Sequence, residues 1–345
     1  MDRYFMHKEK GKILVTGGLG FIGSHTVVEL QNKGFDVVII DDLSNSKIEV
    51  LDGITSITGI QPEFVQLDLK DKGKVVEFFA NSKIEGVIHF AASKAVGESV
   101  EQPLKYYENN IATLVYLLQE MAKNEVTNFI FSSSCTVYGQ ADELPITEKA
   151  PIKSAESPYG NTKQIGEEII EDATKVSDLN AIALRYFNPI GAHESTKIGE
   201  LPIGVPQNLI PFVTQTAAGM REELSVFGSD YPTPDGTAVR DYIHVVDLAK
   251  AHIAALKRLI ERKNKEKMEF FNVGTGKGSS VLEVIRAFEK VSGQNLKYKI
   301  VGRREGDITS AYADTSFANQ ELAWKAELGL EEALDSAWKW QLKQV

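Results

Sequence analysis

The chain has 345 residues, of which 38 are lysine or arginine and 48 are aspartate or glutamate, so its formal net charge is -10 at pH 7. This negative charge argues against general nucleic-acid binding, and any anionic ligand must therefore be met by local cationic groups. No segment approaches the roughly eighteen apolar residues of a membrane-spanning helix, and the N-terminus shows no apolar signal segment, so we expect a cytoplasmic protein without a membrane partner.

A glycine-rich turn near the N-terminus is the most informative local motif. Residues 12–23 read KILVTGGLGFIG, a short apolar run followed by spaced glycines and the start of an amphipathic helix. At Gly17, Gly20 and Gly23 the backbone must turn sharply, approach a pyrophosphate and let the helix lie against the strand, and a Cβ would obstruct each of these. Gly18, Gly20 and Gly23 also fit the G-x-G-x-x-G spacing. The N–H groups of a helix start bind phosphates, so the motif predicts a dinucleotide site.

Acidic residues follow at the distance expected for the end of the second strand. The predicted helix covers 21–33, with Gly34 as its C-terminal cap, and the next apolar run predicts a strand at 36–40. Asp41 can then accept a hydrogen bond from a ribose hydroxyl. Asp41 and Asp42 have no adjacent arginine to accommodate a 2′-phosphate, so they favour NAD over NADP.

Two further strands are predicted at 62–69 and 86–90. The first ends near Asp68, and the second leads into the small residues and lysine of the segment AASK at 91–94. Ligands of open parallel sheets lie at the carboxyl ends of the strands, so we expect both segments to line the same crevice as the glycine turn.

A long helix is predicted at 102–124. Its apolar positions lie three, four and seven residues apart and are Leu104, Ile111, Leu114, Leu118 and Met121. Asn109 and Asn110 interrupt this face at mid-length. Two interpretations remain open from the sequence: these amides are solvated, or they face the sheet and brace backbone beside the cofactor.

A fifth strand at 128–132 runs into a segment rich in hydroxyl groups. The segment reads SSSCTVYG and carries Ser132, Ser133, Ser134 and Thr136. Hydroxyl groups at the end of a buried strand can orient a ligand hydroxyl without adding charge. Taken alone, the segment is equally consistent with an ordinary turn.

A tyrosine and a lysine then occur four residues apart at a helix start. Ser157 and Pro158 begin the helix, so Tyr159 and Lys163 share one face. A free tyrosine titrates near about 10 and becomes a useful base at neutral pH only where a cation favours the phenolate. We expect Lys163 and a positively charged nicotinamide to supply that charge. In isolation the same spacing also fits an amphipathic surface helix.

The second half of the chain changes character after a strand at 181–187. Prolines and glycines are frequent between 202 and 236, around a predicted helix at 209–218 and a strand at 224–227. A helix at 245–261 and an apolar stretch at 269–274 are expected to return to the first sheet, and the segment 281–292 begins a second part of the inserted region.

The fold class predicted from this order is α/β: a doubly wound parallel (Rossmann) sheet with a smaller mixed α/β capping domain. We assign residues 1–190 and 241–275 to the dinucleotide-binding domain, and 191–240 and 276–345 to the cap. Arg240, Arg303 and Arg304 fall in predicted loops of the cap, where forked arginine donors suit a diphosphate. Scattered surface arginines are the alternative interpretation.

No metal site is predicted. The six histidines and the single cysteine, Cys135, show no spacing typical of zinc ligands. One cysteine cannot form an internal disulfide, and we expect it to pack behind the strand at 128–132.

Eight strings, in the order in which they occur, resemble the extended short-chain dehydrogenase/reductase family and, within it, the UDP-glucose (UDP-galactose) 4-epimerases. They are TGGLGFIGSH, DDLSNS, VIHFAASKAVGES, FSSSCTVYG, SPYGNTK, LRYFNPIGA, FGSDYPTPDGTAVRDYIHV and RREGD. The resemblance implies an isomerase that inverts C4 of UDP-hexoses through a transient 4-keto sugar with bound NAD. It also implies a homodimer formed through the helices at 102–124 and 158–176. Two departures are visible: Ala92 and Ser93 replace a Gly and a Leu common in the family, and Cys135 replaces a frequent Ala.

Site residues carried over from the family follow the same strings. The catalytic residues would be Ser134, Tyr159 and Lys163. The cofactor contacts would be Gly17, Gly20, Phe21, Ile22, Gly23, Asp41, Asp42, Leu43, Ser44, Asn45, Ser46, Asp68, Leu69, Phe90, Ala91, Ala92, Ser93, Lys94, Asn109, Tyr159, Lys163 and Phe187. The substrate contacts would be Ser134, Tyr159, Asn188, Asn208, Leu209, Ser225, Val226, Phe227, Arg240, Arg304, Asp307 and Ala311.

Ala311 bears on the width of the substrate range. In the resembled family, the residue four positions after the equivalent of Asp307 lies beside the sugar's C2 substituent, and a large aromatic there tends to restrict the enzyme to 2-hydroxy sugars. Alanine is small, so we expect UDP-N-acetylglucosamine and UDP-N-acetylgalactosamine to be substrates as well. The alternative is an enzyme restricted to UDP-glucose and UDP-galactose.

Two rival functions fit these residues less well. A sugar-nucleotide 4,6-dehydratase on the same scaffold would carry Asp and Glu directly after Ser134, but those positions are Cys135 and Thr136. A non-catalytic NAD-sensing module would not need Tyr159 and Lys163 in register with Ser134.

Overall fold

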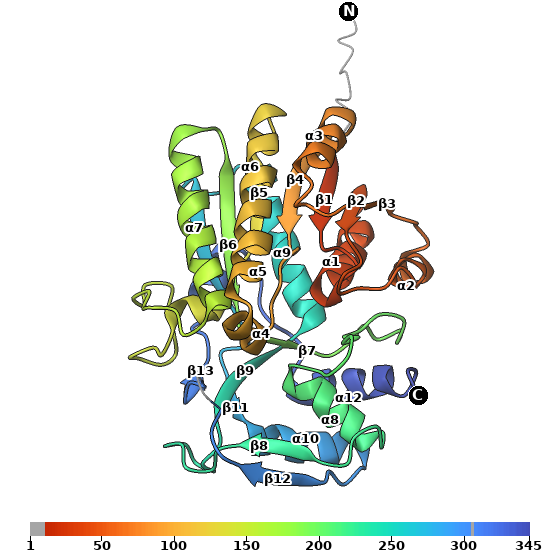
Figure 1. Ribbon diagram of the computed structural model, residues 1–345, viewed down its shortest axis with the longest axis vertical. Coiled ribbons are helices and arrows are strands. Elements are labelled where there is room, and N and C mark those ends of the chain that lie inside the picture. The colour runs from red at the N-terminus through yellow and green to blue at the C-terminus, as the bar shows by residue number, and fades with distance from the viewer. Residues whose placement is uncertain (1–10, 305–306) are drawn as a thin grey trace, which may run out of the picture.

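The computed structural model describes residues 11–304 and 307–345 (Figure 1). The N-terminal ten residues, in which we expected no signal segment, and residues 305 and 306 of the RREGD string lie outside the described residues. The larger part of the molecule is built on a seven-stranded sheet in the order β10-β6-β5-β4-β1-β2-β3. Its strands are β1 Lys12–Thr16, β2 Val37–Asp41, β3 Glu63–Gln66, β4 Ile84–His89, β5 Asn128–Ser132, β6 Asn180–Tyr186 and β10 Met268–Val273.

All neighbouring strands of this sheet run parallel. The chain lays down β1, β2 and β3 toward one edge and then returns to place β4 on the other side of β1. The strand order therefore reverses between β1 and β4. In open parallel sheets the crevice at the carboxyl ends of such a pair of strands is the place where ligands bind.

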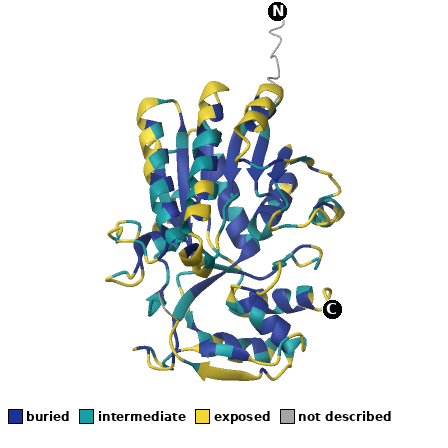
Figure 2. Ribbon diagram, in the orientation of Figure 1, coloured by how far each residue is buried: buried dark blue, intermediate teal, exposed yellow. Residues whose placement is uncertain are grey.

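Helices cover both faces of the larger sheet, which confirms the predicted doubly wound class (Figures 1 and 2). Alternate strand residues point to opposite sides, so that Ile13 and Val15 join one core cluster and Leu14 joins the other. The helices on the first face are α1 Phe21–Asn32, α2 Val50–Thr58, α9 Val245–Ile260 and α11 Ser316–Glu321. Those on the second face are α3 Lys72–Asn81, α6 Thr113–Lys123 and α7 Pro158–Val176.

The long helix predicted at 102–124 is interrupted. It consists of α5 Pro103–Tyr107, a π-helical turn at Glu108–Ala112 and α6. A π-helical turn adds one residue to the helix, so the side chains before it are rotated about the helix axis relative to the side chains after it. Leu104 is consequently 80% exposed, although the apolar spacing placed it on the same buried face as Leu114. That part of the prediction was wrong.

The smaller part of the molecule contains the remaining sheets and lies beyond the carboxyl ends of the larger sheet (Figure 1). In one sheet β9 pairs with β7, β11 and β13, and in the other β8 pairs with β12. The strands are β7 Asn188–Ile190, β8 Leu224–Phe227, β9 Val239–His244, β11 Gly278–Ser280, β12 Tyr298–Val301 and β13 Ser310–Ala311. The helices are α8 Leu209–Ala217, α10 Val281–Ser292 and α12 Leu330–Gln341. These helices pack around a separate apolar core that includes Phe288 and Trp338.

Two segments cross the predicted division of the chain. The strand β9 belongs to the smaller sheet, whereas the sequence placed residues from 241 onward in the larger part. Conversely, α11 packs on β10, and its Phe317 stacks on Phe271 with 5.2 Å between ring centroids. Trp324, just after this helix, is buried in the core of the larger part. The two parts are thus interleaved, and the boundaries at 240 and 276 remain a proposal.

Two features typical of other classes of protein are absent from the described residues. Among residues 11–304 and 307–345, no helix is long and apolar enough to cross a membrane. The same residues contain no group of three or more histidine, cysteine, aspartate or glutamate side chains arranged to hold a metal ion.

Buried histidines predict a loss of stability in acid. Burial lowers the pKa of His25 and of His89 to about 3, and the pKa of His244 and of His252 to about 4. The unfolded chain, in contrast, binds these protons near pH 6.5. Because protonation then favours the unfolded state, the free energy of unfolding should fall between pH 6.5 and 4, by about 2 kcal/mol per histidine at pH 5.

Urea unfolding at pH 7, 6 and 5 measures this dependence. The variant His252→Leu removes one such group, whose Nε2 has no partner among the described residues, and should flatten the slope by about a quarter. An unfolding free energy that is equal at pH 7 and pH 5 would contradict the prediction.

Candidate active site

The glycine turn between β1 and α1 has the shape expected for binding phosphate. Gly17 has φ +69°, which favours glycine. A Cβ at Gly23 would lie 2.2 Å from the carbonyl oxygen of Gly17, so only glycine lets the helix approach the strand so closely. A Cβ at Gly20 would meet only that same oxygen, at 3.2 Å, and would otherwise fill the open side of the turn. Gly20 is also the N-cap of α1 and offers no side chain to the helix N–H groups, which leaves them available to an anion.

Asp41 ties this turn to the loop after β2. Its carboxylate accepts hydrogen bonds from the N–H groups of Leu19 and Leu43, both at 3.0 Å, and from the Ser46 hydroxyl at 2.7 Å. A carboxylate can accept about four hydrogen bonds, so acceptor capacity remains for a ribose hydroxyl. Asp42 instead shapes the loop, because it accepts from both the N–H and the hydroxyl of Ser44.

The asparagines of the π-helical turn brace the segment after β4. The Asn110 side chain, 6% exposed, accepts from the Ser93 N–H at 2.8 Å and donates to the Ser93 carbonyl and the Thr162 hydroxyl, both at 3.0 Å. Asn109 donates to the Ser93 hydroxyl at 3.2 Å. Of the two interpretations left open by the sequence, the structure favours bracing over solvation. The π-helical turn lets consecutive side chains reach one loop.

The structure brings the Ser134, Tyr159 and Lys163 side chains together. The Ser157 hydroxyl caps the start of α7 by accepting from the Gly160 N–H at 3.1 Å, with Pro158 in the first turn. Lys163 is 5% exposed and donates to the carbonyl of Ser132 at 2.6 Å. Its Nζ lies 5.8 Å from the centre of the Tyr159 ring. The serine strand end and the tyrosine helix therefore meet at the carboxyl edge of β5.

Burial dominates the electrostatics of this site. It raises the pKa of Tyr159, with the nearby Tyr186 acting in the same direction and the Ser134 hydroxyl opposing it. Burial likewise lowers the pKa of Lys163 to about 8, against the charge of Glu167. The expected support of the Tyr159 phenolate by Lys163 and a positively charged nicotinamide stays a prediction. A positive charge beside the phenol would favour the phenolate and so the action of Tyr159 as a base near neutral pH.

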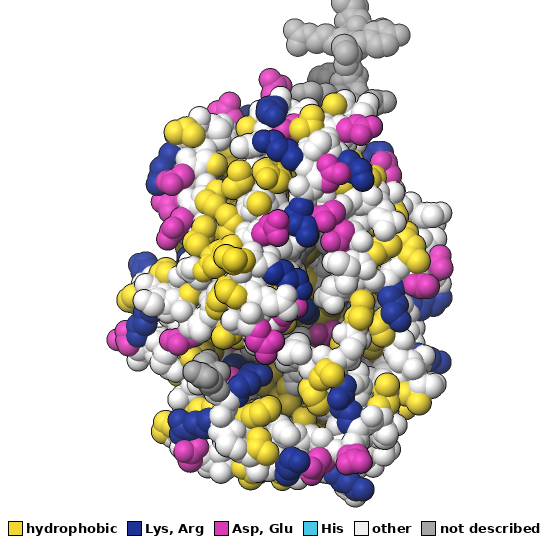
Figure 3. Space-filling view, in the orientation of Figure 1, with side chains coloured by type: hydrophobic (Ala, Val, Ile, Leu, Met, Phe, Trp, Pro, Cys, Tyr) yellow, Lys and Arg dark blue, Asp and Glu magenta, His cyan; other side chains and the backbone are white. Residues whose placement is uncertain are grey.

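Basic groups of the smaller part converge on one carboxylate. Arg240 lies on β9 rather than in the expected loop, and its Nη2 is 3.5 Å from Oδ1 of Asp307. Nη2 of Arg304 approaches the same oxygen at 3.0 Å. Arg303 points elsewhere, to Asp230, and is engaged there. Figure 3 shows basic side chains beside the hollow between the two parts of the molecule.

The segment after β7 reaches across that hollow to the larger part of the molecule. Glu200, whose side chain is 13% exposed, accepts from Asn208 at 2.6 Å and lies 3.7 Å from Nζ of Lys94. Glu200 thus links loops of the two parts of the molecule. The sequence did not indicate this contact, because no local pattern connects Glu200 to residues 94 and 208. Asn188 begins β7 next to the carboxyl end of β6.

The remaining predicted site residues fall into three groups. At the start of α1 and after β2, β3 and β4 lie Phe21, Ile22, Asn45, Asp68, Leu69, Phe90, Ala91 and Ala92. At the end of β6 lies Phe187, which is buried. In the smaller part, Leu209 begins α8, and β8 carries Ser225, Val226 and Phe227.

Two small residues near the site pack in one apolar cluster. Ala311 on β13 is 1% exposed and packs in a cluster with Val137 and Phe187. The open volume expected beside its Cβ is therefore not present in this conformation. Cys135 is half-buried and packs against the same cluster, and desolvation raises the pKa of its thiol to about 12. That value agrees with a packing role and argues against a reactive thiolate.

Comparisons with known proteins show which family the chain resembles. The sequence model of the family described as GDP-mannose 4,6 dehydratase matches residues 14–337. A curated protein from Bacillus subtilis named UDP-glucose 4-epimerase is 51% identical over 96% of this chain and 97% of its own length. The solved UDP-glucose 4-epimerase of Bifidobacterium longum, in complex with NAD+ and UDP, is similar with a TM-score of 0.92 and 48% identity, covering 96% of this chain and 98% of that chain.

A third solved structure, the UDP-Glc/GlcNAc 4-epimerase of Campylobacter jejuni, has a TM-score of 0.83 and 35% identity, with 97% of this chain and 100% of that chain covered. The relatives match this chain nearly end to end. The chain belongs to the UDP-glucose 4-epimerases, within the extended short-chain dehydrogenase/reductase family.

Proposed function

We propose that this chain interconverts UDP-glucose and UDP-galactose by inverting C4 of the sugar, with NAD held in the protein throughout. The observation that carries the proposal is the meeting of Ser134, Tyr159 and Lys163 at the carboxyl edge of β5, beside a glycine turn that a Cβ would fill. The similar proteins named above as UDP-glucose 4-epimerases support it.

The residues around the glycine turn fit NAD. The N–H groups at the start of α1 would hold the pyrophosphate, Asp41 would accept from the adenosine ribose, and Lys163 would hold the other ribose. Lys94 and the segment that Asn110 braces would complete this side of the site. When bound, NAD supplies a reversible two-electron oxidant for C4 of the sugar and a positive nicotinamide beside Tyr159.

Side chains of the protein then transfer the proton of the sugar 4-hydroxyl. Tyr159 removes the proton of the sugar 4-hydroxyl, Ser134 steadies that oxygen, and Lys163 stabilises the phenolate. Loss of that proton from O4 and of a hydride from C4 would give a transient 4-keto sugar. After the sugar turns, the same hydride would return to the opposite face of C4, and Tyr159 would return the proton to the 4-oxygen. No net oxidation of the sugar results.

Inversion requires the sugar to turn while the nucleotide stays bound. Arg240 and Arg304 suit the diphosphate because guanidinium groups bind phosphate oxygens in pairs, and in the free protein they share Asp307 instead. Asn188 and Asn208 would contact the substrate from the hollow's rim, and β8 would contact the nucleoside. Few groups would then restrain the hexose itself.

A single assay separates this function from its rivals. Purified protein incubated with UDP-galactose should form UDP-glucose until the two sugars reach equilibrium, without added cofactor. A 4,6-dehydratase would instead accumulate a 4-keto-6-deoxy sugar, detectable by mass spectrometry as a loss of water. A non-catalytic NAD-binding module would leave UDP-galactose unchanged.

We also propose that the chain forms a homodimer in the cytoplasm. The surface of the helices α5, α6 and α7 leaves apolar side chains exposed, including Leu104 at 80% and Val176 at 87%. Figure 3 shows hydrophobic side chains gathered over this face. Exposed apolar groups of this kind typically mark a protein interface. Light scattering coupled to gel filtration should give twice the mass of 38.1 kDa. The variant Leu104→Glu should shift the protein toward the monomer.

A wider substrate range is our second proposal for the same site. The small Ala311 and the similarity to a UDP-Glc/GlcNAc 4-epimerase support turnover of UDP-N-acetylglucosamine and UDP-N-acetylgalactosamine. Because Ala311 is enclosed, the loop carrying β13 must move to admit an N-acetyl group. The variant Ala311→Tyr should abolish turnover of the N-acetyl pair and spare that of the plain pair.

Both substrate pairs are measured in both proteins. A tyrosine at 311 overpacks its cluster at a cost of about 1–3 kcal/mol, so thermal unfolding of the variant accompanies the assay. A wild-type protein inert toward N-acetyl sugars, or a variant that still converts them, would refute the wider range.

A further inference from the structure

A buried ion pair lies directly behind the proposed catalytic groups. Glu167 is on α7, one turn after Lys163 and on the same face. Its Oε1 accepts from Nε of Arg185 at 2.9 Å, and its Oε2 accepts from Nη2 of Arg185 at 2.7 Å. Glu167 is 6% exposed and Arg185 is 5% exposed. Neither residue belongs to the cofactor or substrate contacts described above.

One hydrogen bond links this pair to the catalytic strand end. The Ser133 hydroxyl donates to Oε1 of Glu167 at 2.6 Å, and Ser133 is completely buried. The preceding residue, Ser132, provides the carbonyl that accepts from Lys163. The next residue, Ser134, provides the hydroxyl beside Tyr159. Glu167 therefore binds Ser133, which lies between the residue that contacts Lys163 and the residue that contacts Tyr159.

Further hydrogen bonds connect this ion pair to the segment just after β13. Nη1 of Arg185 donates to the Tyr138 hydroxyl at 3.0 Å, and that hydroxyl donates to Asn272 at 2.7 Å. The Asn272 amide donates to the Ile146 carbonyl at 2.9 Å. Ile146 in turn bridges to Ala313, just after β13. The α7 helix, β6, β10 and the segment after β13 are thus joined behind the site by consecutive polar contacts.

Stability alone does not explain a buried pair of this kind. Replacing buried ion pairs by well-packed apolar residues is often neutral or stabilising, because both charges lose their hydration on burial. Fixed geometry is what such a network provides. A bidentate guanidinium and a carboxylate that also accepts from Ser133 allow little rotation of either element.

We propose that Glu167, oriented by Arg185, is a positioning residue that fixes the end of β5 through Ser133 and so keeps Ser134 and Lys163 in place beside Tyr159. The proposal rests on the epimerase function assigned above. Misplacement of reacting groups by about 1 Å can lower a rate by about a hundredfold, so loss of the link should appear in turnover more than in substrate binding.

The test uses two variants of Ser133 and one of Glu167 in the full protein. Ser133→Ala removes the link and leaves the ion pair intact, and it should lower kcat for UDP-galactose by about tenfold to a hundredfold with KM changed less than about twofold. Ser133→Thr keeps the hydroxyl and should recover most of the lost turnover. Glu167→Gln removes the charge that orients Arg185 and should lower kcat at least as far as Ser133→Ala.

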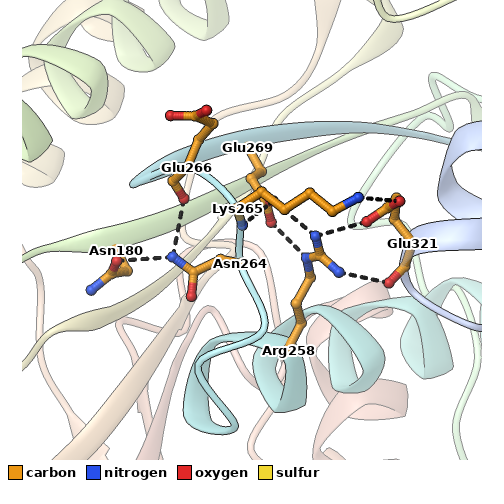
Figure 4. A network of polar contacts seen from close by, with 7 residues as sticks. All are labelled: Asn180, Arg258, Asn264, Lys265, Glu266, Glu269 and Glu321. Atoms are coloured by element: carbon orange, nitrogen blue, oxygen red, sulfur yellow. Dashed lines mark hydrogen bonds and ion pairs between the residues drawn. The ribbon is translucent and has the colours of Figure 1, made fainter.

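A matched control is available at the edge of the sheet. Arg258 of α9 binds Glu269 of β10 through two contacts, at 2.7 and 2.9 Å, and both residues are buried like the pair behind the site (Figure 4). Their other contacts, to Glu321 and Lys265, do not reach the catalytic strand. Glu269→Gln should therefore lower the melting temperature and leave kcat within about twofold of the wild type.

The outcomes distinguish this inference from the function on which it rests. A wild-type protein without epimerase activity would remove the function itself. An active wild type whose Ser133→Ala variant keeps kcat within twofold would overturn the positioning role. So would a Glu269→Gln variant that loses as much turnover as Glu167→Gln, because the loss would then result from breaking any buried pair. If Glu167→Gln does not fold, the Ser133 variants decide.

Discussion

Replacing Tyr159 by phenylalanine should lower the turnover of UDP-galactose by about a hundredfold or more while the purified protein keeps its NAD. General acid and base catalysis typically contributes a factor of this size, and phenylalanine keeps the ring but has no proton to exchange. Lys163 would still be held by the Ser132 carbonyl, so the cofactor side of the site should be little changed. Steady-state rates and the NAD released on denaturation are the two measurements.

The control for this variant is Tyr116→Phe. Tyr116 is on α6, where Lys72 lies over its ring, and it takes no part in the proposed site. The Tyr116→Phe variant should convert UDP-galactose at the wild-type rate. Turnover close to normal in Tyr159→Phe would remove Tyr159 from its role as the proton carrier.

The variant Gly23→Ala should lose most of the NAD that the wild-type protein retains on purification. The added Cβ would lie 2.2 Å from the Gly17 carbonyl oxygen and 2.8 Å from the Cα of Gly18, both of which are backbone atoms that cannot swing away. The turn or the start of α1 must therefore shift, and the N–H groups that face the pyrophosphate shift with it. We expect NAD content at purification to fall by about tenfold or more and epimerase activity to fall with it.

Gly97→Ala is the matched control, since no heavy atom would lie within 4 Å of its added Cβ. Gly97 is within α4 Val96–Glu101, where alanine is the better helix former. That variant should keep its NAD and its melting temperature. A Gly23→Ala protein that also retains full NAD would show that the turn tolerates a side chain and that its glycines serve folding alone.

Local signals in the sequence predicted the larger part of the fold well. The strand at 128–132 and the helix at 158–176 were predicted with the bounds observed, because caps and periodicity lie within each segment. The Ser157 cap and the four-residue spacing of Tyr159 and Lys163 were visible in the same way. Contacts within a few residues are what a sequence pattern encodes.

The features that the sequence did not predict depend on contacts between residues far apart along the chain. The π-helical turn is stabilised by the hydrogen bonds of Asn110 to Ser93 and Thr162, which no window of the sequence contains. Burial, which requires the whole fold, decides the pKa of Tyr159 and encloses Ala311. The pairing of Glu167 with Arg185 joins a helix to a neighbouring strand, and a buried arginine within an apolar strand was its only sign in the sequence.

Isotope retention at C4 tests the central claim most directly. UDP-galactose carrying deuterium at C4 is incubated with the purified protein in ordinary water, and the UDP-glucose formed is analysed by mass spectrometry and NMR. Transient oxidation within a closed site predicts that the deuterium stays at C4 of UDP-glucose, without loss to solvent and without added NAD. Deuterium lost to water, or the absence of any UDP-glucose, would contradict the mechanism.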